Sequence, residues 1–323
     1  MQLPMLSRKL IVLLLTAALA ACESLVTDID QSKLPQVDSK LVVQCFISPQ
    51  AARTNVVVTE SIPLFAEPDY LKGGVIRNAV VRLSDGTKEV VLPFDTTSQL
   101  FSIDKSLFII SPGKTYFLSV TDGARSVNAS CKVPANEVKP ATYDIDSSFS
   151  GSGAGRDTSL TLKMTWNDIA QETNYYRVRA SLDLEYSVAD RLPDNTGQMT
   201  EKRIRNRFNF NWDDTIGRND FRSDQNLDGT VFNSPIGRVN LPDPLSYGFN
   251  GVDYIVYPKS KIVSVTMEVY NTDENYFKYH RSVQTRGDSD NPFVEPSLIY
   301  TNINGGLGCF GAYNSGQVVY RPK

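Results

Sequence analysis

Apolar and polar residues alternate in short runs along the first part of the chain. Six such runs follow one another at short intervals: 40–47, 54–59, 75–84, 89–93, 115–120 and 126–133. Alternation of this kind indicates strands with one buried face. Asp85-Gly86 separates two of the runs, and Asp-Gly between alternating runs is a strong signal for a hairpin turn. Because short strands with regular turns are typical of a sandwich, we predict an immunoglobulin-like β-sandwich domain over residues 40–134.

A second block of alternating residues begins at residue 159. Residues 159–166, 175–186 and 261–270 place apolar side chains at every second position. Residues 203–208 carry arginine at every second position, which predicts a strand with one basic face. We therefore predict a second β-rich, sandwich-like domain over residues 159–323.

Two segments lack this periodicity. Residues 135–158 contain a run rich in Gly and Ser and are predicted to be a flexible linker. Residues 213–251 are rich in Asp, Asn, Gly and Pro and are expected to be largely loop. Thr272-Asp273-Glu274 then opens the only convincing helix, expected at about 273–284, because a capping residue followed by acids suits the positive end of a helix. The predicted fold class is all-β with one helix.

The composition limits the chemistry that the chain can carry out. The 323 residues include one histidine, His280, so a Ser-His-Asp or Cys-His pair could use only this residue. We expect His280 to be a packed or solvated helix residue, and no paired spacing typical of a zinc site is present. Without residues 1–21, which hold two basic residues and no acidic one, 31 Lys plus Arg face 36 Asp plus Glu. The resulting net charge of −5 disfavours nucleic acid as a partner.

The chain begins with an export signal that ends in a cysteine. Two basic residues precede an apolar run, 10–19, that is too short to span a bilayer core of about 30 Å as a helix. Leu19-Ala20-Ala21-Cys22 matches the bacterial lipobox, in which the chain is cut before the cysteine and the new terminus is acylated. Several acyl chains anchor a protein firmly. We therefore predict a lipoprotein signal peptide over 1–21, a lipidated Cys22 and a tether over 22–39.

Three further cysteines are Cys45, Cys131 and Cys309. Cys45 and Cys131 lie in the first and last strand-like runs of the first domain, and an exported protein folds in an oxidising compartment. A disulfide between them would close a loop of about 86 residues and stabilise the domain by roughly 4–5 kcal/mol. The alternative is two free thiols buried in a β core, because sequence separation does not fix the distance between two Cα atoms. Cys309 is left over and is expected to be buried.

Two short motifs each allow a ligand-binding and a purely structural interpretation. Asp224-Gln225-Asn226-Leu227-Asp228-Gly229 matches the opening of a calcium loop, with oxygen ligands from Asp224, Asn226 and Asp228. Pro235 stands where the bidentate Glu should be, so the alternative is a polar hairpin loop. Calcium is the only candidate cofactor. The segment 306–311 matches G-x-G-x-x-G, but the 12 residues after it read as a strand. We therefore expect these glycines to allow a tight bend or a close backbone approach, and we expect no dinucleotide.

No arrangement typical of a catalytic site stands out. Glycoside hydrolysis needs a pair of carboxylates, which could come from Asp213, Asp214, Asp220 and Asp224, but these residues lie in predicted loop, where carboxylates are usually solvated. Trp166, Trp212 and the many tyrosines could form a platform for sugar rings, but most occupy alternating strand positions, which favours a place in the core. We therefore predict that the protein is not an enzyme.

Several segments form a series along the chain. They are the lipobox, Lys40-Leu41-Val42-Val43 with Phe46-Ile47-Ser48-Pro49, the helix residues 275–279, Asn291-Pro292-Phe293-Val294-Glu295-Pro296 and the tail 301–313. Together they resemble the Bacteroidota lipoprotein family described as domain of unknown function 4249. This resemblance implies a β-rich lipoprotein of the outer membrane, often encoded beside TonB-dependent transporters, and it implies no established activity.

The anchor, the two β domains and the resemblance lead to one functional expectation. The protein is expected to be a lipid-anchored outer-membrane binding or accessory protein that assists a TonB-dependent transporter in capturing a small ligand, mainly through residues 187–258. The alternative is a structural or adhesive envelope lipoprotein with no transported ligand. The sequence leaves open the ligand, the oligomeric state and whether the protein faces the periplasm or the cell surface.

Overall fold

The computed structural model describes residues 38–62, 74–150, 157–191, 199–212, 220–249, 252–286 and 298–322. Contacts divide the chain into one unit of residues 1–39 and 62–72 and a second unit of residues 40–61 and 73–323. Nearly all of the first unit lies outside the described residues, and the description that follows concerns the second unit. The predicted signal peptide, the tether up to residue 37 and Cys22 also lie outside the described residues.

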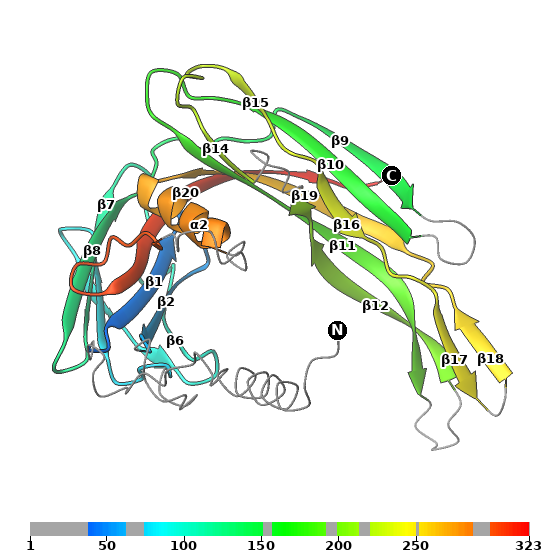
Figure 1. Ribbon diagram of the computed structural model, residues 1–323, viewed down its shortest axis with the longest axis horizontal. Helices are drawn as coiled ribbons and strands as arrows, with labels where there is room; N and C mark the ends of the chain where they lie inside the picture. The colour runs from blue at the N-terminus through cyan, green and yellow to red at the C-terminus, as the bar shows by residue number, and fades with distance from the viewer. Residues whose placement is uncertain are drawn as a thin grey trace, which may run out of the picture. The chain divides into compact units, whose positions relative to one another are not determined.

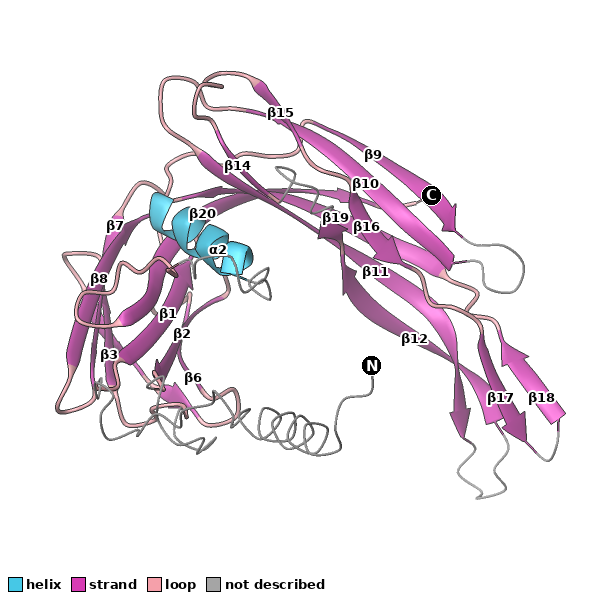
Figure 2. Ribbon diagram, in the orientation of Figure 1, coloured by secondary structure: helices cyan, strands magenta, loops and turns pink. Residues whose placement is uncertain are grey.

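The fold is all-β and sandwich-like, as the alternation predicts. Strands make up 58% of the structure, and the described residues contain one helix, α2 (Glu274–Arg286) (Figure 2). This helix lies within two residues of the range expected from Thr272-Asp273-Glu274. The described part of the chain contains no helix of the length and apolar character needed to cross a membrane.

The largest sheet has nine strands and runs through most of the second unit (Figure 1). Its strands follow the order β12 (Met199–Asn209), β11 (Tyr175–Arg191), β19 (Lys261–Thr272), β20 (Leu307–Tyr320), β1 (Leu41–Ile47), β2 (Arg53–Glu60), β6 (Leu100–Asp104) and β5 (Phe94–Asp95), and β14 (Phe221–Ser223) pairs with β11.

A four-stranded sheet and part of the nine-stranded sheet enclose a first hydrophobic core. The four strands follow the order β4 (Glu89–Leu92), β3 (Val80–Ser84), β7 (Thr115–Thr121) and β8 (Ser126–Lys132). Every second residue of β1 and β8 is buried, which confirms the period of two read from the sequence. The core also takes Ile303, Phe310 and Ala312 from the end of the chain.

A five-stranded sheet covers a second core. Its members are β13 (Asn211–Trp212), β16 (Gly237–Asn240), β10 (Asp157–Asn167), β15 (Val231–Asn233) and β9 (Thr142–Ser150). Trp166 on β10 is fully buried in this core, where its ring lies 5.8 Å from that of Tyr176 on β11. The expectation that tryptophan serves packing is therefore correct for Trp166. A separate hairpin is formed by β17 (Leu245–Phe249) and β18 (Val252–Val256).

Strand β20 belongs to both halves of the nine-stranded sheet. Its first residues pair in parallel with β1, from Val42↔Leu307 to Ile47↔Ala312. Its later residues pair antiparallel with β19, from Thr272↔Tyr313 to Val265↔Tyr320. Strand β20 therefore contributes side chains to both cores. The domain boundaries expected from the sequence stay a prediction.

The glycines of β20 allow close backbone approach, which is one of the two alternatives expected from the segment 306–311. Gly308 has φ +104°, and a Cβ there would lie 2.0 Å from the carbonyl oxygen of Val43 on β1. A Cβ at Gly311 would lie 3.0 Å from the backbone of Tyr276, at the start of α2. These positions therefore let β20 pair with β1 and let the helix pack directly on the strand.

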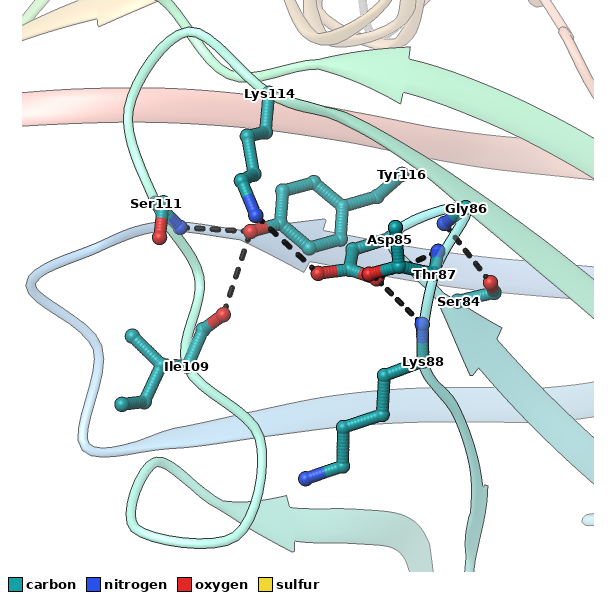
Figure 3. A network of polar contacts seen from close by, with 9 residues as sticks. All are labelled: Ser84, Asp85, Gly86, Thr87, Lys88, Ile109, Ser111, Lys114 and Tyr116. Carbon is teal, nitrogen blue, oxygen red and sulfur yellow. Dashed lines mark hydrogen bonds and ion pairs between the residues drawn. The ribbon is translucent and has the colours of Figure 1, made fainter.

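The predicted hairpin at Asp85-Gly86 joins β3 to β4. The Asp85 carboxylate accepts hydrogen bonds from the backbone N–H groups of Lys88 (2.8 Å) and Thr87 (3.0 Å), while Gly86 has φ +86° (Figure 3). The bond from Lys88, followed by those from Thr87, holds the pKa of Asp85 well below its usual range. Asp and Gly thus supply the turn chemistry on which the prediction rested.

Two segments differ from the sequence-based expectation. Strand β9 lies inside the segment 135–158 that was expected to be a linker. It pairs with β10 from Thr142↔Thr165 to Ser150↔Asp157. Strands β14 to β17 lie inside 213–251, which was expected to be largely loop. In both places backbone pairing with a long neighbouring strand outweighs a composition rich in Gly, Ser, Asp and Pro.

Candidate functional site

A cavity of about 1030 Å³ lies beside the first residues of β11. One wall comes from residues 171–175, a second from residues 223–228, and a third from α2 together with Tyr300. The whole of the second wall falls within the range 187–258 that was expected to hold a ligand. The helix and the residues before β11 were not part of that expectation.

Aromatic rings from the first and third walls, those of Tyr175, Phe277 and Tyr300, lie on the helix side of the cavity. The rings of Tyr175 and Phe277 lie with centroids 4.8 Å apart and an interplanar angle of 38°. The Tyr300 hydroxyl donates to Asn275 Oδ1 at 2.7 Å, and its backbone N–H donates to Ser282 Oγ at 2.9 Å. All three rings are partly exposed, so the wall is held in place by the protein while some of its apolar surface still faces the cavity.

Asp273 fixes the start of α2. Its Oδ1 accepts the N–H of Tyr276 at 2.8 Å, which makes Asp273 the N-cap of the helix, whereas the sequence-based expectation placed the cap at Thr272 and Asp273 in the first turn. The same atom accepts the N–H of Ala312 on β20 at 3.0 Å. Burial raises the pKa of Asp273 to about 7, although these two hydrogen bonds oppose the shift. One carboxylate therefore joins the helix to the strand beneath it.

A buried ion pair supports the helix one turn further along. Arg177 Nε donates to Asp220 Oδ2 at 2.8 Å, and Arg177 Nη1 donates to the Tyr276 hydroxyl at 2.8 Å. The guanidinium also lies 4.6 Å from the ring centre of Phe221. Asp220, one of the carboxylates considered for hydrolysis, is thus bound to an arginine. Asp213 and Asp214 lie outside the described residues.

Three carboxylates meet at the wall formed by residues 223–228. Oxygen atoms of Asp168, Asp224 and Asp228 lie within 4.8 Å of one another. The spacing of the sequence motif predicted Asp224 and Asp228, and the structure brings these two together. Asn226, the third predicted ligand, has φ +65° and lines the cavity. Asp168 follows β10, far away in the sequence, and was missed because the motif contains only neighbouring residues.

Backbone groups hold each of the three carboxylates. Asp224 Oδ2 accepts the N–H of Asn174 at 2.8 Å, Asp228 Oδ1 accepts that of Gln171 at 2.8 Å, and Asp168 Oδ2 accepts that of Gly229 at 2.8 Å. Burial, followed by the charges of Asp168 and Asp228, raises the pKa of Asp224 above its usual range. A divalent cation between the three groups would relieve this repulsion, and oxygen atoms are the ligands that calcium prefers. The calcium site stays a prediction.

Calcium is expected to raise the thermal unfolding temperature of the purified protein by several degrees. At about 10 mM calcium, a dissociation constant of roughly 10⁻⁴–10⁻³ M would stabilise the folded state by about 1.5–3 kcal/mol. Differential scanning calorimetry with and without calcium measures the shift. Asp228→Asn removes one charge from the cluster and should abolish the shift, whereas Asp190→Asn, outside the cluster, should leave it unchanged. An unfolding temperature that does not respond to calcium in the wild-type protein would contradict the prediction.

One family profile matches residues 23–318 of the chain, and its description is a domain of unknown function, DUF4249. The chain belongs to this family. The match covers nearly all of the chain after the predicted signal peptide, including every element of the cavity. No curated protein matches the sequence.

The three cysteines in the described part of this DUF4249 chain are buried and free. Cys45, Cys131 and Cys309 are at most 3% exposed, and none forms a disulfide. Cys45 and Cys131 pack in the first core, which is the second of the two alternatives that the sequence left open. Burial raises the pKa of each thiol, so all three are neutral at physiological pH.

His280 is packed on α2 and takes no part in the cavity wall. Its ring lies 4.3 Å from that of Tyr276 and 4.8 Å from that of Phe46. Burial, with a contribution from the charges of Arg177 and Arg179, lowers the pKa of His280 to about 3. The packed alternative is therefore correct, and the imidazole is uncharged at neutral pH.

Proposed function

We propose that this chain is a lipid-anchored binding protein of a bacterial outer membrane, which assists a TonB-dependent transporter by capturing its ligand. The observation that carries the proposal is the cavity beside α2. Its volume of about 1030 Å³ is at the upper end of the range for small-molecule sites, roughly 300–1,000 Å³. Helix α2 forms one wall of the cavity. Its position is fixed by the Asp273 N-cap and by the hydrogen bond that Arg177 donates to the Tyr276 hydroxyl.

The residues around the cavity favour binding over catalysis. Asp220 is bound to Arg177, and the carboxylates of Asp168, Asp224 and Asp228 accept backbone hydrogen bonds. The imidazole of His280 is packed among aromatic rings. Groups held in this way are suited to a rigid binding surface, and we propose no catalytic role for them.

The proposed location rests on sequence. Leu19-Ala20-Ala21-Cys22 has the order of a lipobox, and the tail of the chain resembles Bacteroidota lipoproteins. An acylated Cys22 would keep the cavity close to the membrane, where a transporter could receive the ligand. In the competing proposal of an adhesive or structural envelope protein, the anchor has the same role and no transporter is bound.

Tagged protein extracted from native outer membranes in mild detergent is expected to bring down a TonB-dependent transporter, identified by mass spectrometry. Cys22→Ala should appear in the soluble fraction and should no longer recover the transporter, because its tether is not acylated. Ser24→Ala, a change two residues away, is the matched control and should behave like the wild type. Recovery of the wild-type protein without a transporter would reject the partner, and membrane retention of Cys22→Ala would reject the anchor.

A further inference from the structure

The cavity presents apolar ring surface on one side and both uncharged polar and charged groups on the others. Tyr175, Phe277 and Tyr300 supply the rings. Because Tyr175 packs on Phe277 and the Tyr300 hydroxyl donates to Asn275 Oδ1, these side chains have less freedom to lose when a ligand arrives. Such a wall favours a ligand with a flat, rigid, partly apolar face.

Five uncharged polar side chains lie around this wall. They are Gln171, Thr173, Ser223, Gln225 and Asn226. Amide and hydroxyl groups both donate and accept hydrogen bonds, so together they match a ligand that carries many groups of the same double character. Hydroxyl groups have this character, whereas phosphates and carboxylates only accept.

The charges around the cavity do not favour an anionic ligand. The lining contains three acidic residues, Glu172, Asp224 and Asp228, and two basic residues, Lys278 and Arg281. Both cations already have neighbours on the helix: Lys278 Nζ lies 2.8 Å from Glu274 Oε1, and the Arg281 guanidinium lies 5.8 Å from the ring centre of Phe277. A phosphate or carboxylate would have to compete with these contacts and would also meet three carboxylates.

From these observations we infer that the cavity binds an uncharged oligosaccharide. A pyranose ring has an apolar C–H face that can lie on Tyr175, Phe277 or Tyr300, and its hydroxyls can pair with the amides and hydroxyls of the rim. The volume of about 1030 Å³ leaves room for more than one ring. This inference rests on the proposed function, because it names the class of ligand that the protein would capture.

Isothermal titration calorimetry on the soluble Cys22→Ala chain tests the ligand class. The probes are cellohexaose, maltohexaose, xylohexaose and laminarihexaose, with N-acetyl-hexaglycine amide (hexaglycine with both termini blocked) and glucose 6-phosphate as uncharged-peptide and anionic comparators. At least one hexasaccharide is expected to bind, and more tightly than either comparator. If no hexasaccharide binds, or if hexaglycine or glucose 6-phosphate binds more tightly, the inference is wrong.

Two cavity variants and one control locate the site. Tyr175→Ala removes part of the ring wall and should weaken hexasaccharide binding by about tenfold. Gln225→Ala changes an exposed turn residue without altering the core and should weaken binding by about threefold. Phe117→Ala removes an exposed aromatic ring from β7, away from the cavity, and should leave affinity unchanged. Unchanged affinity in both cavity variants would place the sugar elsewhere and overturn the inference.

The two proposals can fail separately. Recovery of a transporter without saccharide binding would reject the ligand class and leave the proposed function in place. Saccharide binding that depends on Tyr175 and Gln225, without recovery of a transporter, would reject the partner and leave the ligand class in place.

Discussion

Gly308→Ala is expected to destabilise the fold by more than about 3 kcal/mol, because the new methyl group would overlap backbone. A Cβ at this position would lie 2.0 Å from the carbonyl oxygen of Val43 and 2.8 Å from its carbonyl carbon. Rotation of a side chain cannot relieve such an overlap, so β20 would have to move away from β1. Since β20 also pairs with β19 and contributes to both cores, the damage should not stay local.

Gly123→Ala is the matched control for this experiment. Gly123 also has a positive φ, +95°, but a Cβ there would meet nothing within 4 Å. Its replacement should therefore cost only the backbone strain, about 1 kcal/mol. Urea unfolding followed by tryptophan fluorescence gives both values. Equal losses for the two variants would mean that backbone conformation, and not the approach of β1, explains Gly308.

The same glycines illustrate how far sequence reasoning reaches. The residues after Gly311 read as a strand, which disfavoured a dinucleotide site and left a tight bend or close backbone approach as the role of the glycines. The partners in that approach could not be predicted. Gly308 meets Val43 of β1, and Gly311 meets Tyr276 of α2. The parallel pairing of β1 with β20 depends on tertiary packing. The residue pattern within each segment indicates a strand but does not identify the strand that pairs with it.

Strand β12 shows a similar limit. The alternating arginines predicted a basic face, and the structure pairs that face with acids on β11. Arg203 lies 2.6 Å from Glu185, and Arg207 lies 2.9 Å from Asp183. The period of two fixes which residues share a face, whereas the charge opposite each arginine depends on register between the strands. A basic stripe in the sequence is thus partly neutralised in the folded protein.

The candidate site was predictable only where its residues are neighbours in the chain. Asp224 and Asp228 come from one six-residue motif, and the structure brings their oxygen atoms together. Asp168 and the aromatic wall come from other elements. Tyr175 opens β11, Phe277 lies on α2 and Tyr300 follows it. Each of these residues has an ordinary role in its own segment, and only the packing of α2 against β20 and β11 makes them a cavity.

Asp220→Ala is expected to reduce the free energy of unfolding by about 3 kcal/mol, because it leaves the Arg177 guanidinium buried without its carboxylate. The side chains of this pair are 16% and 10% exposed, and their charged atoms lie 2.8 Å apart. The hydrogen bond from Arg177 to the Tyr276 hydroxyl would remain but could not replace the lost charge. Because Tyr276 belongs to α2, the helix and the cavity wall should also become less well fixed.

An exposed ion pair provides the comparison for Asp220→Ala. Arg82 and Glu89 lie 3.1 Å apart with side chains 46% and 53% exposed, so Glu89→Ala should cost less than about 1 kcal/mol. Combining Asp220→Ala with Arg177→Met should restore part of the lost stability, since the double variant has no uncompensated charge. Chemical denaturation of Asp220→Ala, Arg177→Met, Glu89→Ala and the double variant gives the change in the free energy of unfolding for each. Similar losses for Asp220→Ala and Glu89→Ala would show that Arg177 does not depend on Asp220. A double variant as unstable as the sum of its single changes would show that the two side chains act independently.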